Sequence, residues 1–221
     1  MKRVILAGAA LFSILILTAC GGGGDDRREP PTIVTQILSD STFDGDIAQD
    51  PLTGAFTVAQ GNTQSVFAGV DPVTGKEYRA FLDFPLTGAD GVPGDAAIVS
   101  ATLDIVINSI RPQPLVGTIP VRIDLVNFQP PTLVGTDFSR TIQPALASTT
   151  IFPPIDQFDL NGHVPVDVTA LMNEAQRFGL ANFQIRILMD FDAVADGLIE
   201  INDTTGPNRD ILAPVLEVAY F

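Results

Sequence analysis

Short segments in which apolar and polar residues alternate are the feature that most constrains the fold of this chain. The clearest of them cover residues 78–84, 102–108, 121–125 and 184–191. Alternation with a period of two is typical of half-buried strands, which turn one face to the core and the other to solvent. Because Pro, Gly and Asn separate the segments as turn residues do, the pattern predicts an all-β fold, an antiparallel β-sandwich.

One segment breaks this pattern and favours a single short helix. Its apolar residues recur at helical spacing at Val168, Leu171, Met172, Ala175 and Phe178. Asp167 or Thr169 is suited to cap its start, and Gly179 suits the left-handed residue that follows a helix. We expect a helix at about residues 169–178 whose apolar side covers the core of the sandwich.

The first twenty residues have the three parts of a secretory signal. A basic start, Lys2 and Arg3, precedes sixteen uncharged residues, 4–19, which fall short of the ~20 that a membrane-spanning helix needs. The sequence LTAC at residues 17–20 matches the lipobox of bacterial lipoproteins at all four positions. This resemblance implies cleavage before Cys20, diacylglycerol on its sulfur and a further acyl chain on the new amino terminus.

The only cysteine, Cys20, is therefore predicted to be a lipid attachment site and not a catalytic thiol. Two or more acyl chains hold a protein firmly on a bilayer. Gly21 stands where an inner-membrane retention signal has Asp, so we expect a bacterial cell envelope location with the outer membrane favoured, facing the periplasm or the cell surface. A buried soluble helix is the alternative for the apolar segment, but it does not explain the four glycines that follow.

The length and the net charge of the mature chain limit its domain organisation and its possible partners. We expect a signal peptide at residues 1–19, a lipidated cysteine and flexible tether at 20–31, and a single domain at 32–221, since no repeat or second linker is visible. Loss of Lys2 and Arg3 leaves ten basic residues against 26 acidic ones, a net charge of −16. Such a surface is poorly suited to nucleic acid, whose binding requires Lys and Arg on the phosphates.

Four segments occur in the order of one known family: EYRAFLDFPLTG, AAIVSATLDIVI, VPVDVTALMNEAQ and LIEINDTTGPNRDILAPVLEVAYF. The matching positions are Tyr78, Arg79, Phe84, Ser100, Ala101, Leu103, Asp167, Val168, Thr169, Arg209, Pro214, Leu216, Val218 and Tyr220. Residues 42–221 thus resemble the DNRLRE-type domain, which is similar to carbohydrate-binding module family 96 and to disaggregatase-related modules. The resemblance implies a jelly-roll-like β-sandwich and polysaccharide binding. The chain departs from the family in having no Trp, because many members carry a Trp-rich segment before the helix.

The sequence offers little for catalysis. His163, the only histidine, lies in LNGHVPV, which reads as a solvated turn before a strand. With one His and one lipidated Cys, zinc sites built on nitrogen and sulfur ligands are excluded, and no Ser-His-Asp relay is identifiable. Glycoside hydrolysis requires two carboxylates at a set separation, and sequence spacing singles out no pair among the 26 acidic residues. We therefore do not expect an enzyme.

Two acidic runs, TFDGDIAQD and MDFDAVADG, are weak candidates for a structural calcium ion, which favours several oxygen ligands gathered by a loop. Their carboxylates belong to Asp44, Asp46, Asp50, Asp190, Asp192 and Asp196. Neither run has the EF-hand spacing, and the alternative is that these are turn and edge-strand aspartates, which discourage aggregation. No other cofactor is expected.

Exposed aromatic rings that stack on sugars are the other candidate feature. Tyr78 and Tyr220 fall on strand faces that the alternation places in the core, which leaves Phe81, Phe138 and Phe152 as exposed candidates. None of these singles out a binding site. The leading expectation is a non-catalytic surface module that binds polysaccharide or extracellular matrix. An assembly scaffold among envelope proteins is the alternative, and a carboxylate-based polysaccharide-cleaving enzyme is the third class.

Overall fold

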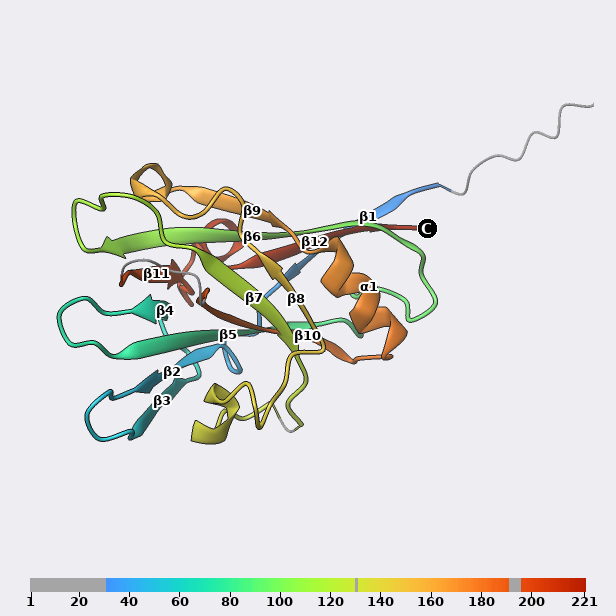
Figure 1. Cartoon of the computed structure of the whole chain (residues 1–221). Coiled ribbons are helices and arrows are strands. Elements are labelled where there is room, and N and C mark those ends of the chain that lie inside the picture. The colour runs from blue at the N-terminus through green and yellow to red at the C-terminus, as the bar shows by residue number, and fades with distance from the viewer. Residues whose placement is uncertain (1–30, 130, 191–195) are drawn as a thin grey trace, which may run out of the picture. The chain divides into compact units, whose positions relative to one another are not determined.

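Twelve strands and two α-helices make up the part of the chain that the computed structural model describes, residues 31–129, 131–190 and 196–221 (Figure 1). The strands are β1 (Ile33–Leu38), β2 (Gly45–Gln49), β3 (Phe56–Gln60), β4 (Ser65–Val70), β5 (Glu77–Pro85), β6 (Ile98–Arg111), β7 (Val121–Val126), β8 (Ala147–Thr150), β9 (His163–Asp167), β10 (Asn182–Met189), β11 (Leu198–Asn202) and β12 (Val215–Tyr220). The helices are α1 (Thr169–Arg177) and α2 (Arg209–Leu212), and 3-10 turns cover Gly135–Phe138 and Gln157–Asp159. Residues 31–221 form a compact unit by themselves.

The pairing of the strands forms an antiparallel sandwich, as the alternation predicted. The strand order is β1-β12-β6-β11-β4-β5-β10-β7-β8, with β9 beside β6, β2 beside β5 and β3 beside β2. The long strand β6 belongs to both layers, because its first half pairs with β12 and β9 and its second half pairs with β11. Leu103 of β6, Leu82 of β5 and Ile185 of β10 are at most 1% exposed and belong to one core between the layers.

The predicted helix is confirmed as α1. It buries Leu171 and Met172 against the core, and the chain leaves it through Gly179, whose φ of +62° is the left-handed conformation that glycine adopts without strain. The Asp167 carboxylate accepts a hydrogen bond from the backbone N–H of Thr169 at 2.9 Å, so it satisfies one of the free donors at the helix start. None of the described helices is long and apolar enough to cross a bilayer.

The connection between β7 and β8 folds over the outer face of β2, β5, β10 and β7. We call residues 127–146 the cover segment, of which Pro130 is not described, and the face beneath it the covered face. A second apolar cluster forms there from Ile47, Phe81, Val126, Phe128, Leu133 and Phe138. The expectation that Phe81 and Phe138 are exposed is therefore wrong: they are 3% and 4% exposed, because the cover segment closes the face that alternation assigns to solvent.

Nothing in the described chain covers the opposite outer face in this way. This open face consists of β1, β12, the first half of β6 and β9, which lie side by side (Figure 1). Its outward side chains include the polar residues Gln36, Glu217 and Thr102 and the apolar residues Val34 and Leu38, and all five are exposed or half-buried. The open face is the part of the sandwich that is available to a ligand.

Candidate functional site

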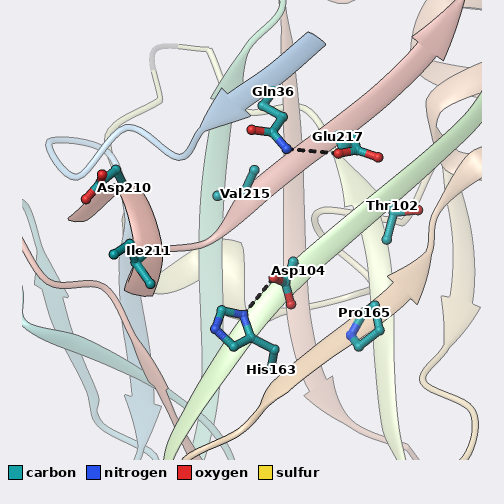
Figure 2. A pocket seen from close by; sticks show the side chains of 9 residues that line it. All are labelled: Gln36, Thr102, Asp104, His163, Pro165, Asp210, Ile211, Val215 and Glu217. Carbon is teal, nitrogen blue, oxygen red and sulfur yellow. Dashed lines mark hydrogen bonds and ion pairs between the residues drawn. The ribbon is translucent and has the colours of Figure 1, made fainter. Parts of the chain in front are cut away.

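A groove of about 450 Å³ crosses the open face (Figure 2). Four strands and the short helix α2 supply its lining: Gln36 from β1, Thr102 and Asp104 from β6, His163 and Pro165 from β9, Asp210 and Ile211 from α2, and Val215 and Glu217 from β12. This volume lies in the range typical of small-molecule sites. We call it the open-face groove.

Strand register explains why these side chains meet. Glu217 pairs with Gln36 on one side and with Thr102 on the other. In the next outward row, Asp104 pairs with Val215 and with Pro165. Directly opposed residues of antiparallel strands project to the same side of the sheet, so positions far apart in the sequence form two adjacent rows.

Two hydrogen-bonded pairs fix the polar groups of the groove (Figure 2). The Gln36 amide Nε2 donates to Glu217 Oε2 at 2.9 Å, and His163 Nδ1 lies 2.8 Å from Asp104 Oδ2. The second carboxylate oxygen of Asp104, Oδ1, is shielded from solvent and has no hydrogen-bond partner. Because a shielded acceptor without a partner is costly, this arrangement of Asp104 lowers the stability of the fold.

The groove offers both polar and apolar groups to a ligand. Its carboxylates and amide accept and donate hydrogen bonds, while Val215, Ile211 and Pro165 provide apolar contact. Among the described residues, the hydrogen-bond partner of the His163 ring is Asp104, through Nδ1. His163 is solvated as predicted, with 51% of its side chain exposed, but it opens β9 and pairs with a carboxylate that sequence reasoning did not connect to it.

A second hollow of about 420 Å³ lies at the edge of the cover segment and has the opposite charge. Arg79, Arg140, Phe56 and Phe138 are among its lining residues. The Arg79 guanidinium carbon lies 3.9 Å from the centre of the Phe138 ring, and Arg79 also donates to Glu77 Oε1. Because Arg79 is 7% exposed and its donors bond within the protein, it holds the cover segment in place and offers little to a ligand.

Beneath the cover segment, the carboxylate of Asp124 joins three arginines. It accepts hydrogen bonds from Arg186 at 2.9 Å, Arg140 at 2.9 Å, Arg122 at 3.0 Å and Ser148 at 2.7 Å. Burial acts to raise the pKa of Asp124, but these hydrogen bonds outweigh it and hold the pKa below its ordinary value. Asp124 and Arg186 are both completely buried, so the pair is a structural ion pair and not a ligand site.

The carboxylates of the first acidic run, Asp44, Asp46 and Asp50, are each engaged with different partners. Asp44 is buried against Asp203, and its pKa is well above the ordinary value because of burial and the neighbouring carboxylate. Asp46 points elsewhere and accepts from the Phe67 amide at 3.3 Å, while Asp50 caps the turn after β2. In residues 31–129, 131–190 and 196–221, no group of three His, Cys, Asp or Glu side chains is arranged to hold a metal ion.

Of the second acidic run, Asp190 follows β10, Asp196 is exposed and Asp192 lies outside the described residues. Cys20, the predicted lipidation site, also lies outside them.

None of the aromatic candidates from the sequence, Tyr78, Tyr220, Phe81, Phe138 and Phe152, lines the open-face groove. Tyr220 is buried as expected, whereas Tyr78 is half-buried with its ring 5.7 Å from that of Phe67. Phe152 is 89% exposed, which confirms its predicted exposure, but it lies outside the open-face groove.

The residues that line the groove were not identified as a site from the sequence. Gln36, Asp104 and Glu217 occupy the polar phase of their strands, which marks them only as solvent-facing. Strand pairing is the missing signal, because it decides which solvent-facing positions become neighbours.

No protein-family model matches this chain, and no curated protein is similar to it. The resemblance to the DNRLRE-type domain therefore stays a prediction.

Proposed function

We propose that this chain is a lipid-anchored surface protein of a bacterial envelope whose sandwich binds polysaccharide through the open-face groove without cleaving it. The observation that carries the proposal is the groove itself, which lies on the one broad sheet face that the cover segment leaves free. Its polar groups come in two hydrogen-bonded pairs, Gln36 with Glu217 and Asp104 with His163. Groups held in this way lose little side-chain entropy when a ligand binds.

The charge of the groove favours an uncharged ligand rich in hydroxyl groups. Asp104, Asp210 and Glu217 are carboxylates that accept hydrogen bonds from hydroxyls. His163 is the only lining residue that can carry a positive charge. Such a lining repels uronates, sulfates and phosphates. The apolar side chains of Val215 and Ile211 are placed to contact the C–H faces of a sugar ring.

Absence of catalysis is part of the proposal. Sugar cleavage requires an acid and a base or nucleophile on opposite sides of the scissile bond. In the groove, the Glu217 carboxylate accepts from Gln36 and the Asp104 carboxylate pairs with His163, so both are engaged in positioning contacts. Release of reducing ends from a bound polymer would contradict the non-catalytic part alone.

Binding is tested on a glycan array with the domain of residues 31–221, which is compact by itself. We expect saturable binding to a neutral polymer in the micromolar to millimolar range, as for a module with no aromatic platform. Asp104→Ala and Gln36→Ala should each weaken binding about tenfold or more, because each removes a group that a hydroxyl would contact. Asp95→Asn, an exposed carboxylate outside the groove, is the matched control and should bind as the wild type does.

An assembly scaffold is the second candidate, and one observation favours it: none of the nine residues that line the groove is Phe, Tyr or Trp. If every glycan on the array gave no signal and envelope proteins co-purified with the chain, the scaffold would replace the glycan-binding proposal.

The lipid anchor has its own test, since it depends on the lipobox and not on the groove. Cys20→Ser in the full chain should abolish acylation and lipoprotein-specific cleavage, so the precursor with its signal peptide should accumulate in place of the acylated mature form. A variant that still partitioned with membranes and matured at the same site would contradict the anchor.

A further inference from the structure

The most exposed apolar side chains of the described structure all lie in connections at one end of the sandwich. They are Leu52 at 93%, Val73 at 88%, Val116 at 90%, Phe152 at 89% and Phe158 at 94% exposure. The next most exposed large apolar side chains, Ile142 and Ile211, reach 59%. We call these five the tip residues. Their exposed fractions are well above those of the other apolar side chains on the surface, which are of an ordinary kind.

Contacts between four connections show that the tip residues share one end. A side-chain carbon built on Gly75 would lie 3.4 Å from Pro51, so the β2–β3 and β4–β5 turns are neighbours. The backbone N–H of Leu115 donates to the Gln157 side chain at 2.7 Å, and Ile119 pairs with Ile155, so the connections after β6 and after β8 are also neighbours. Figure 1 shows the β2–β3 and β4–β5 turns and the far end of β6 on the same side.

This loop end lies opposite the point where the chain enters the domain. At the other end, Ile33 pairs with Tyr220, which pairs with Ile98 at the start of β6. Strand β6 then runs to Arg111 at the loop end. The described chain therefore begins at the end of the sandwich opposite the loop end.

Three of the tips are built alike, on turns that an aspartate holds. The carboxylates of Asp50, Asp71 and Asp156 accept hydrogen bonds from the backbone N–H two residues later, which belong to Leu52, Val73 and Phe158, at 2.9, 2.8 and 2.7 Å. These bonds are Asx turns. They fix the turn and give the backbone N–H of the tip residue a hydrogen-bond partner. Without that partner, moving the N–H into an apolar medium would cost free energy.

We propose that the loop end inserts its tip residues into the surface of a zwitterionic lipid bilayer. The five side chains project separately from four connections, and none of them lines the open-face groove or the hollow beside Arg79. Separate projections suit a soft apolar layer, whereas a protein partner would need a matching pocket for each. This site is distinct from the proposed polysaccharide groove.

Charge selects the kind of lipid. The tip residues are uncharged. The carboxylates of Asp50 and Asp71 lie close behind them, with pKa values held low mainly by backbone hydrogen bonds and to a smaller extent by the cations Lys76 and Arg111. The carboxylates of Asp156 and Asp159, beside Phe158, add to the acidic groups at this end. In a chain of net charge −14 these groups are repelled by anionic headgroups. They are compatible with the ammonium group of phosphatidylcholine or phosphatidylethanolamine.

A single tryptophan provides the first test, because the chain has none of its own. In the domain of residues 31–221, Phe158→Trp should give a blue-shifted emission with phosphatidylcholine vesicles and should be quenched by brominated acyl chains. Phe221→Trp, at the opposite end, is the control and should show neither effect. An unchanged Phe158→Trp spectrum would overturn the proposal.

A vesicle partition assay gives the second test. The triple variant Leu52→Ser, Val73→Ser and Phe158→Ser should lower the partition coefficient about a thousandfold, since each exposed side chain contributes about tenfold when buried in an apolar medium. Val34→Ser, Val99→Ser and Phe221→Ser together remove three exposed apolar side chains from the opposite end and should partition as the wild type does.

The tip variant should unfold at the wild-type denaturant concentration, because exposed side chains contribute little to folding. Tip-dependent dimers in sedimentation, without vesicle binding, would assign the tips to a second copy of the chain and refute the lipid.

Discussion

On the covered face, the outward positions of β5, β7 and β10 carry Phe81, Asp124 and Arg186, and each of them is buried. On the open face, the corresponding positions of β6 and β12 carry Asp104 and Glu217, and these stay accessible. The strands of both faces alternate in the same way. The cover segment alone makes the difference, because it removes one face from water and leaves the other.

A buried carboxylate and an accessible one differ in how many hydrogen bonds the protein gives them. Asp124 receives four hydrogen bonds, three of them from arginines, because an unpaired charge under the cover segment would be very costly. Asp104 receives one, from His163, and keeps an oxygen without a partner. The covered carboxylate is saturated by hydrogen bonds within the protein, while the open one keeps an unpaired oxygen. The predictions that follow test this contrast from the largest expected effect to the smallest.

Asp124→Ala should have the largest effect. It leaves the fully buried Arg186 guanidinium without a carboxylate, and we expect the free energy of unfolding to fall by about 3–5 kcal/mol. Urea denaturation followed by circular dichroism measures this. The double variant Asp124→Leu, Arg186→Met should recover most of the loss, because it removes both charges. If Asp124→Ala alone were as stable as the wild type, water would have to reach the Arg186 guanidinium, and the covered face would not be closed to solvent.

Phe81→Ala should cost about 3 kcal/mol, because it opens a cavity in the cluster beneath the cover segment. Phe152→Ala is the matched control. Alternation and composition make both residues candidates for exposed rings, but Phe152 is 89% exposed and its loss should change stability by less than about 0.5 kcal/mol. Equal losses in the two variants would contradict the different burial of the two rings.

The pH dependence of stability should have opposite signs for two buried carboxyls. Burial raises the pKa of Asp46 from 3.8 to about 6, so its contribution is complete below about pH 4 and is lost as the pH rises through about 6. The pKa of Asp124 is lowered, so its contribution is present above about pH 4 and is lost as the pH falls.

Urea unfolding between pH 3 and pH 7 checks both signs. Asp46→Asn should remove a decline of about 2–3 kcal/mol on the way from pH 4 to pH 7. If the free energy of unfolding changed with pH in the same way in the wild type and in Asp46→Asn, the raised pKa of Asp46 would be refuted.

Asp104→Ala should have the smallest effect on folding, below about 1 kcal/mol, because its partner His163 is half exposed. Its expected consequence is on glycan binding. Thermal unfolding of this variant beside Asp124→Ala compares the two faces directly. A loss as large as that of Asp124→Ala would mean that the groove is a structural element and not a binding site.

The sequence by itself determined the local structure of this protein. Alternation in residues 78–84 and 184–191 predicted strands, and helical spacing with Gly179 predicted α1 and its end, because a strand repeats every two residues and a helix every 3.6 regardless of what packs nearby. The antiparallel sandwich followed from the number of such strands and their turns.

Only the tertiary structure decided which faces are closed and which side chains meet. Alternation states that a strand has two faces, but the cover segment decides that Phe81 and Phe138 are buried, and no local pattern encodes where a long connection settles. The groove depends on pairs separated by 59 residues, Asp104 with His163, and by 181 residues, Gln36 with Glu217. Such pairs are set by strand register, which is the result of packing the whole core and cannot be read from either segment alone.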